Sequence, residues 1–368
     1  MTKRKIINDP VYDGFLSIDD PVILSVVGHP FFQRQRRIKQ LGLTYLVYPG
    51  AMHTRFSHML GALNLMGRAL DVLRMKGVEI SDEECRGAKL AILLHDIGHG
   101  PFSHTSERVL VDVPHEEITL LMMQRINEEM GGALDTAIAI FSNTYHKHFL
   151  HQMVSSQLDM DRLDYLGRDS FFTGVSEGIV GTDRIISMLN VHDDELVIDE
   201  KGIYSVEKFI ISRRLMYWQV YMHKTVIAAD QLLLSILRRA KELNLSTFSF
   251  QLSTFDLDRF AEVDDDDIMV AVKHWQYSDD EILSTLCKNL VNRRLPAIRF
   301  SSEPFTDVRS TYFEGTGKLA NRSYDFNDQE IKVLYKDGRC LPISEASDQL
   351  DRHFLEKQVT KYYYYHPK

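Results

Sequence analysis

The stretch Leu93–His104 reads L-L-H-D-I-G-H-G-P-F-S-H and places three histidines and an aspartate within ten residues of a chain that has 15 histidines. His95 and Asp96 follow an apolar run and precede a glycine-rich break. Two adjacent side chains at the end of a helix can reach one ion that lies between their two directions. An imidazole and a carboxylate together are suitable ligands for a first-row divalent metal. Burial of so many titratable groups requires a partner for each, so the stretch predicts a metal site rather than histidines that cap helix carbonyls.

Composition indicates a globular protein of one large or two smaller domains. The chain has 368 residues, 44% hydrophobic and 26% charged, and three scattered cysteines that predict a reducing interior. The first residues lack the apolar segment of a signal peptide, and no apolar run approaches the roughly 18–20 residues of a membrane span. We therefore predict a cytoplasmic chain that does not contact a membrane. The net charge of −9 argues against sequence-independent coating of nucleic acid but permits a phosphorylated small-molecule ligand.

Helical periodicity dominates most of the chain. We predict helices over 30–42, 58–76, 81–94, 116–130, 134–141, 149–166 and 182–189 and one long helix from 206 to about 243. Residues 44–50 are predicted to be extended, and 196–198 with 203–205 to form a hairpin. Beyond 246 we predict a helix that begins at the acidic run 264–267, a hairpin around 337–338, a helix over 347–356 and a strand over 362–365. The pattern divides the chain into a mainly helical region, 1–245 with a metal core at 50–170, and a C-terminal α+β accessory region, 246–368.

Two other stretches can supply further ligands, because His95 and Asp96 alone would coordinate an ion too weakly. H-T-R-F-S-H occupies 53–58, and S-Q-L-D-M-D-R-L-D-Y-L-G-R-D-S occupies 156–170. In the second stretch Asp161, Asp164 and Tyr165 fall on roughly one side of a helix. Read without the rest of the chain, the alternative for these acids is a role as helix N-caps and in surface ion pairs.

Several motifs in order resemble the HD phosphohydrolase superfamily, and more narrowly its deoxynucleoside triphosphate triphosphohydrolase branch. They are F-Q-R-x-R-x-I-K-Q-L-G, H-x-x-R-F-x-H, H-D-I-G-H-G-P-F-S-H, H-E at 115–116, D-x-D-R-x-D-Y-x-x-R-D and R-R-x-x-x-x-x-V-Y-x-H-K at 213–224. The resemblance covers about residues 30–225. It implies a mainly α fold, a helical HD-domain bundle, with the small α+β part at the C-terminus.

The resemblance implies that one divalent metal is held by His58, His95, Asp96 and Asp161. Two nitrogens and two oxygens leave positions on a six-coordinate ion for water and a phosphate oxygen. Mixed ligands suit Mn, Fe, Zn or Ni better than Mg, and the sequence does not choose among these.

The resemblance also implies roles around the substrate. His115 would be the general acid, supported by Glu107, with His99 as a phosphate contact and His104 able to do either job. Cations are expected beside the phosphates, and tyrosines close to C2′ would exclude a 2′-hydroxyl. The implied substrate-binding residues are Gln40, Leu41, Arg55, Arg162, Tyr165, Asp169, Arg213, Tyr221 and Lys224.

The basic residues between 34 and 39 are expected to form a solvated face or a subunit interface. Relatives regulated by a guanine nucleotide have an aspartate where this chain has Gly28, so the sequence gives no support for guanine-specific activation. The phosphates of a regulatory nucleotide at a subunit interface could still be bound by four basic residues, Arg34, Arg36, Arg184 and Lys201. The resemblance implies a homo-oligomer, either a dimer or a tetramer.

We predict a metal-dependent phosphohydrolase that converts deoxynucleoside triphosphates to deoxynucleoside and triphosphate. One alternative is an HD-type phosphatase or phosphodiesterase that uses the same metal on another nucleotide, and a second, bridging metal would favour the phosphodiesterase. Another is a non-catalytic nucleotide sensor or nucleic-acid-binding protein. The basic run supports this last alternative, and the net charge weighs against it.

Overall fold

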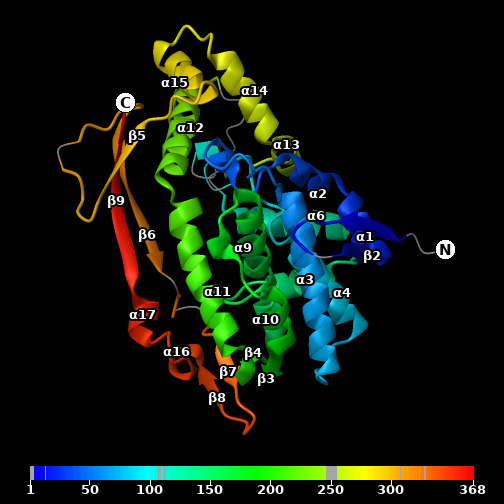
Figure 1. Ribbon diagram of the computed structural model, residues 1–368. Coiled ribbons are helices and arrows are strands. Elements are labelled where there is room, and N and C mark those ends of the chain that lie inside the picture. Colours follow the sequence, from blue (N-terminus) through cyan, green and yellow to red (C-terminus); the bar gives the residue numbers. More distant parts are fainter. Residues whose placement is uncertain are drawn as a thin grey trace.

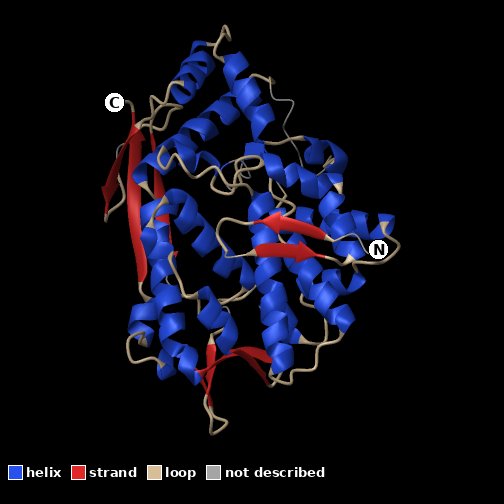
Figure 2. Ribbon diagram, turned by 45° about the vertical axis from the view of Figure 1, so that its right-hand side comes forward, coloured by secondary structure: helices blue, strands red, loops and turns tan. Residues whose placement is uncertain are grey.

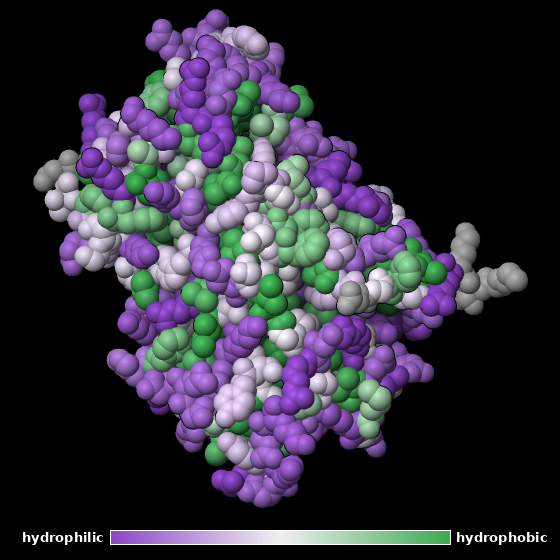
Figure 3. Space-filling view, in the orientation of Figure 1, coloured by the Kyte–Doolittle hydropathy of each residue, from purple (hydrophilic) through white to green (hydrophobic). Residues whose placement is uncertain are grey.

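The computed structural model describes residues 4–12, 14–103, 105, 109–110, 113–245, 255–306, 308–322, 324–326 and 329–368. The fold is mainly α-helical with small sheets, as predicted (Figures 1 and 2). Within the described residues, none of the helices combines the length and the apolar character that a membrane span requires. The face seen in Figure 3 is mostly hydrophilic, with apolar side chains scattered across it.

Three helices form the centre of the molecule: α3 (Arg55–Met75), α4 (Asp82–Leu94) and α9 (Met160–Thr173). Helix α3 packs against both others and buries apolar side chains along most of its length. Helix α4 begins with the predicted capping box, in which Ser81 and Glu84 exchange side-chain and backbone hydrogen bonds. Around this centre lie α1 (Pro21–Gly28), α2 (Pro30–Arg34), α6 (His115–Glu129), α7 (Asp135–Phe141), α8 (His148–Gln152) and α10 (Thr182–Met188).

The prediction of one long helix from 206 to 243 is wrong. The structure has α11 (Ile203–Met216), a π-helical turn Tyr217–Tyr221, and then α12 (Lys224–Glu242). The Nδ1 atom of His223 accepts a hydrogen bond from the backbone of Thr225 and caps the new helix. Apolar periodicity continues through both helices and so conceals the break, which is a widened turn of the kind common at functional sites.

The predicted hairpin around 199–202 is also wrong. The hairpin consists of β3 (Leu189–His192) and β4 (Glu195–Asp199), and residues 203–205 begin α11. Its turn is formed by Asp193 and Asp194, both at positive φ, a conformation that aspartate tolerates better than most residues. Strand β4 pairs in parallel with β7 (Lys332–Leu334), and β7 forms the predicted hairpin with β8 (Cys340–Pro342). The C-terminal region thus extends a sheet that begins in the helical region.

The segment before α3 differs from its prediction in two ways. Helix α2 ends at Arg34 and is followed by a 3-10 turn, and residues expected to be extended form a second 3-10 turn, Gly42–Leu46. Arg34 is buried, not solvated, because its guanidinium donates to the carbonyl oxygens of Val263 and His99 at 2.8 Å each. This contact excludes Arg34 from binding phosphates at a surface.

Of the remaining elements, the strands of the C-terminal region lie beside α12, and the first two strands lie near the N-terminus (Figure 1). The predicted helix start at the acidic run is confirmed, since Asp264 caps α14. A three-stranded sheet in the order β5-β9-β6 lies against α12 through Ile227, Tyr363 and Tyr365. The predicted helix over 347–356 is shorter, and the predicted C-terminal strand is longer. These elements are α13 (Leu257–Glu262), α14 (Asp265–Trp275), α15 (Glu281–Val291), α16 (Ile343–Ala346), α17 (Arg352–Glu356), β1 (Lys5–Asn8), β2 (Phe15–Ile18), β5 (Ala297–Ser301), β6 (Gly315–Arg322) and β9 (Gln358–His366).

Candidate functional site

The centre of the site is a group of three side chains from the three central helices. His58 lies in the first turn of α3, His95 at the end of α4 and Asp161 in the first turn of α9. Asp161 Oδ1 is 3.1 Å from His58 Nε2 and 3.3 Å from His95 Nε2. Atoms that bind one octahedral ion at about 2.1 Å would lie roughly 3 Å apart. The spacing therefore matches that of ligands around a single cation.

The two imidazole nitrogens of this group lack other partners. Among the described residues, neither the Nε2 atom of His58 nor that of His95 has a hydrogen-bond partner, although both are buried. Buried polar atoms normally have one. Burial lowers the pKa of His58, but Asp161 and Asp164 outweigh it and raise that pKa to about 10. The two carboxylates therefore create a place that strongly favours positive charge. A divalent cation bound by neutral imidazoles would satisfy this preference.

The Nδ1 atom of each imidazole, which lies on the side of the ring away from Asp161, is fixed by a hydrogen bond. His95 Nδ1 lies 2.6 Å from the carbonyl oxygen of Ile92, and His58 Nδ1 lies 2.7 Å from Asp164 Oδ2. Because both partners are acceptors, we assign the ring proton to Nδ1 in each histidine. With a cation bound, the lone pair of Nε2 in each ring would be available to that cation, on the side that faces Asp161.

Asp96 stands between this group and a second one. Its carboxylate lies 3.6 Å from His95 Nε2 and 3.7 Å from His58 Nε2, forms an ion pair with Arg55, and lies 3.3 Å from His99 Nε2. Burial raises the pKa of Asp96, but the surrounding cations outweigh it and hold that pKa well below its usual range. Asp96 is therefore ionised and able to serve either group.

The second group consists of Asp96, His99 and His115, whose ligand-type atoms also lie close together. The imidazole rings of His99 and His115 stack with centroids 3.9 Å apart. Gly98 permits this approach, since a Cβ atom there would lie 2.3 Å from the carbonyl oxygen of His115. His115 is partly exposed and lies 3.3 Å from Glu116. The predicted catalytic residues His104 and Glu107 lie outside the described residues.

Both groups open into a cavity of about 430 Å³. Its walls come from the segment before α3, the turn after α4, α6, α9, the π-helical turn and α12. The structure brings together around it the predicted residues Gln40, Leu41, Arg55, Asp96, His99, His115, Asp161, Tyr165, Asp169 and Tyr221.

One wall of the cavity is built around the buried carboxylate of Asp169. The hydroxyl of Tyr221 donates to Asp169 Oδ2 at 2.7 Å, and His53 Nε2 lies 2.8 Å from Oδ1. Tyr165 packs edge-on against Tyr221, with ring centroids 6.2 Å apart. The two tyrosines predicted to face the sugar therefore form one wall with this carboxylate.

Three predicted cations do not line this cavity. Arg162 donates to the carbonyl oxygen of Ser156 at 2.7 Å, Arg213 is buried beside Gln157, and Lys224 is exposed at the start of α12. Their assignment to substrate phosphates stays a prediction.

The sequence did not identify several residues that line the cavity. Asp230 is the most informative of them, because burial raises the pKa of its carboxyl to about 7 although Thr105 donates to it at 3.0 Å. A signal for Asp230 was present, since it is a lone acid in the apolar run V-I-A-A-D. The remaining cavity residues missed by the sequence are Gly42, Thr44, Phe102, Ser103, Thr105, Tyr217 and Val226.

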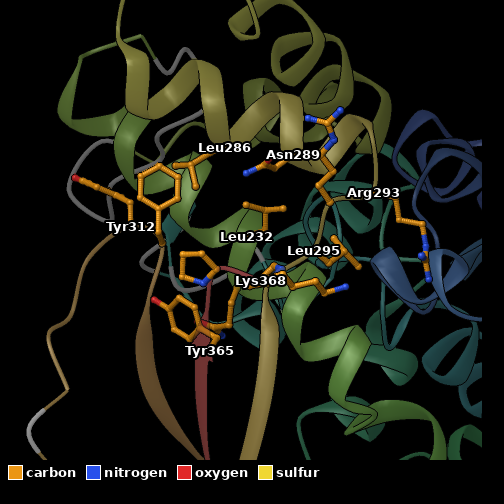
Figure 4. A pocket seen from close by; sticks show the side chains of 13 residues that line it. Leu232, Leu286, Asn289, Arg293, Leu295, Tyr312, Tyr365 and Lys368 are labelled. Atoms are coloured by element: carbon orange, nitrogen blue, oxygen red, sulfur yellow. The ribbon is translucent and has the colours of Figure 1, made fainter.

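Figure 4 shows a second cavity, of about 510 Å³, between α12, α15 and the end of β9. Arg293 borders it and donates to the carbonyl oxygen of Leu46 at 2.8 Å. None of the described residues that line this cavity is a histidine, a cysteine or an acid, so the candidate metal site belongs to the first cavity. The lining residues are Gln231, Leu232, Leu286, Asn289, Arg293, Arg294, Leu295, Pro296, Tyr312, Phe313, Tyr365, Pro367 and Lys368.

Comparisons with known proteins identify the family to which this chain belongs. Residues 55–169 match the profile of the HD domain, and residues 180–313 match the HD associated region. The chain is 36% identical to the YwfO protein of Bacillus subtilis over 344 residues, which cover 88% of this chain and 78% of that protein. It superimposes with a TM-score of 0.95 on a crystal structure of a phosphohydrolase from Bacteroides thetaiotaomicron, at 47% identity and 100% coverage of both chains.

More distant relatives have an activity in their names. The chain is 32% identical over 240 residues to the deoxynucleoside triphosphate triphosphohydrolase SAMHD1 homolog of Dictyostelium discoideum, and 29% identical over 283 residues to human deoxynucleoside triphosphate triphosphohydrolase SAMHD1. The matches cover 60% and 65% of this chain. The chain spans less than half the length of these relatives, 46% and 45%.

Proposed function

We propose, because this chain belongs to the HD-domain phosphohydrolase superfamily in its dNTPase-like branch, that it hydrolyses deoxynucleoside triphosphates to deoxynucleoside and inorganic triphosphate. The observation that carries the proposal is the cavity in which a metal-type group, a histidine pair and a wall of two tyrosines meet. The relatives named as triphosphohydrolases support the choice of substrate.

We propose His58, His95, Asp96 and Asp161 as the ligands of one divalent metal. Once bound, a cation here would polarise a phosphate oxygen and neutralise charge that develops during hydrolysis. The two buried Nε2 atoms face Asp161 and make no well-formed hydrogen bond within the described part of the chain, which supports this assignment. The mixture of nitrogen and oxygen donors favours Mn, Fe, Zn or Ni over Mg.

The histidine pair can supply the proton that the reaction needs. Water attacks the α-phosphorus, the bond between that phosphorus and O5′ breaks, and O5′ takes up a proton as the deoxynucleoside leaves. We assign delivery of the proton to His115, which is partly exposed at the cavity, and a phosphate contact to His99 beside Asp96. Glu107 and His104 keep the supporting roles that the sequence predicts. Arg55 lines the cavity beside Asp96, so its guanidinium is placed to offset phosphate charge there.

The part of the cavity lined by Gln40, Tyr165 and Tyr221 suits a deoxyribose. Gln40 Oε1 is a buried acceptor that has no hydrogen-bond partner among the described residues, so a sugar hydroxyl could donate to it. Tyr165 and Tyr221 would pack close to C2′ and exclude a 2′-hydroxyl, while Asp169 fixes the position of Tyr221. The cavity therefore combines a polar contact for the sugar with a steric limit at C2′.

A specific observation favours a second candidate function. Asp96, His99 and His115 form a second group that could hold an ion next to the first. If both groups held an ion, with Asp96 able to serve either one, the site would suit a phosphodiesterase that acts on another nucleotide. The number of metal ions per chain separates this candidate from the single-metal proposal.

We also propose that the protein is a cytoplasmic homo-oligomer, a dimer or a tetramer. Arg36 and Arg184 are exposed cations that an interface or a regulatory phosphate could use, whereas Arg34 is not. We further propose the division into 1–245 and 246–368 as a functional one, in which the C-terminal region supports α12 from outside. The two regions share a sheet through β4 and β7.

The proposal is tested by incubating the purified protein with each dNTP and Mn²⁺ and separating the products by ion exchange. We expect inorganic triphosphate and deoxynucleoside in equal amounts, and no such products from Asp161→Ala. Release of orthophosphate or pyrophosphate without triphosphate would reject the reaction. A metal content of two ions per chain would favour the phosphodiesterase candidate.

A further inference from the structure

A continuous series of buried polar groups extends away from the cavity behind His58. Asp164 Oδ2 lies 2.7 Å from His58 Nδ1 and 2.8 Å from Arg168 Nε, and Oδ1 lies 3.0 Å from Arg168 Nη2. All three side chains are fully shielded from solvent. The orientation of His58 therefore depends on what holds Asp164 and Arg168.

Two residues from the N-terminal hairpin complete this series. The hydroxyl of Tyr12 donates to Asp164 Oδ1 at 2.7 Å, and Arg168 donates to Asp9 at 2.7 and 3.2 Å. Both residues belong to the segment that joins β1 and β2, more than 40 residues before the stretch that matches the HD domain. The hairpin lies beside the helical core in Figure 2. A segment outside the matched domain thus reaches the back of a proposed metal ligand.

The chemistry of the two contacts suits a structural role at a cation site. Arg168 is shared by two carboxylates, so the series as a whole carries one net negative charge behind the imidazole. Burial, together with the Asp164 charge, raises the pKa of Tyr12 well above its usual value, so the hydroxyl remains a donor. Outer partners of this kind fix the tautomer and ring orientation of a metal-binding histidine.

We propose that the segment joining β1 and β2 is part of the metal centre, in which Asp9 and Tyr12 are positioning residues that hold Asp164 and Arg168 and thereby aim His58 Nε2 at the ion. This inference rests on the proposed metal site but not on the identity of the substrate. Its measurable consequence is that the affinity for metal depends on two residues that bind neither metal nor substrate.

The test measures Mn²⁺ affinity by equilibrium dialysis and elemental analysis of full-length protein. We expect the double variant Asp9→Asn/Tyr12→Phe to bind Mn²⁺ about 10–100-fold more weakly than the wild type, which is the usual effect of removing outer partners. Asp164→Asn should weaken binding at least as much. The matched control is Arg4→Ala, which removes a contact to Ser17 within the same hairpin and should leave the affinity unchanged.

The proposal would be overturned if the double variant bound Mn²⁺ within twofold of the wild type. It would also be overturned if Arg4→Ala lost as much Mn²⁺ affinity as the double variant, because that would indicate general loosening of the hairpin. If the double variant does not fold, Tyr12→Phe alone decides, since it removes a single oxygen atom. Weaker Mn²⁺ binding by a folded Tyr12→Phe supports the proposal, and unchanged binding rejects it. Because the readout is metal binding, failure of the dNTP assignment would leave this result interpretable.

Discussion

Replacement of Gly61 by alanine tests how tightly the centre of the fold is built around the Asp164–Arg168 pair. Gly61 lies one turn after His58 on α3, and a Cβ atom there would stand 2.0 Å from Asp164 Oδ1 and 2.1 Å from Arg168 Nη2. Alanine is favoured over glycine inside a helix by about 1 kcal/mol. Disruption of a buried ion pair costs about 3–5 kcal/mol. We therefore expect Gly61→Ala to lower the free energy of unfolding by about 2–4 kcal/mol, against the helix preference.

The assay is urea denaturation followed by circular dichroism, together with the Mn²⁺ content of the folded protein. Gly67→Ala is the matched control on the same helix, because its Cβ would meet only the flexible end of Lys89, at 3.3 Å. That variant should be as stable as the wild type or slightly more stable. If Gly61→Ala were also as stable as the wild type and bound as much Mn²⁺, the pair would be neither rigid nor coupled to His58.

Three further changes address the cavity and the metal. Tyr221→Phe loses the hydrogen bond to Asp169, so we expect the KM for dNTP to rise several-fold while stability changes by about 1 kcal/mol; an unchanged KM would remove Tyr221 from the substrate wall. Asp230→Asn should stabilise the protein more at pH 8 than at pH 5. The reason is that the pKa of Asp230 is raised to about 7 in the folded state, so the wild type loses stability as the pH rises from about 4 to 7. Thermal denaturation measures the effect, and an equal effect of the substitution at both pH values would contradict this assignment. Removal of metal with EDTA should lower the melting temperature, and Mn²⁺ at about 100 times its Kd should restore about 2.7 kcal/mol; a melting temperature insensitive to both would reject the metal site.

The sequence predicted those parts of the fold and the site whose signals are local. The helical class, the capped start of α4 and the helix start at Asp264 follow from periodicity and capping residues, and the structure confirms them. The π-helical turn was missed because apolar spacing continues through it. The turn at Asp193–Asp194 was missed because it contains no glycine, whereas D-E-K-G at 199–202 does, and glycine is the usual residue at positive φ.

Contacts between distant segments could not be predicted from one sequence. The charge pattern of the basic run is the same whether Arg34 faces solvent or donates to the carbonyl oxygens of His99 and Val263, and only the fold distinguishes the two. One partner of Asp164, Tyr12, likewise comes from a segment more than 150 residues earlier in the chain. Asp230 lies in the cavity wall on α12, the helix that follows the π-helical turn, and periodicity did not reveal the break between α11 and α12.

The position of the His95–Asp96 pair at the end of α4 explains how one dipeptide can serve two groups of side chains. Adjacent residues on a helix point about 100° apart, so inside a helix they could not both face one ion. At the last turn His95 directs Nε2 toward Asp161, while Asp96 lies between that group and His99. The glycine that follows lets α6 approach closely enough for His115 to stack on His99. Gly98→Ala, whose Cβ atom would lie 2.3 Å from the carbonyl oxygen of His115, would therefore push α6 away and separate the proposed proton donor from the proposed metal ligands. Such a variant should keep its Mn²⁺ but lose hydrolysis, and loss of both in a folded protein would contradict this division of roles.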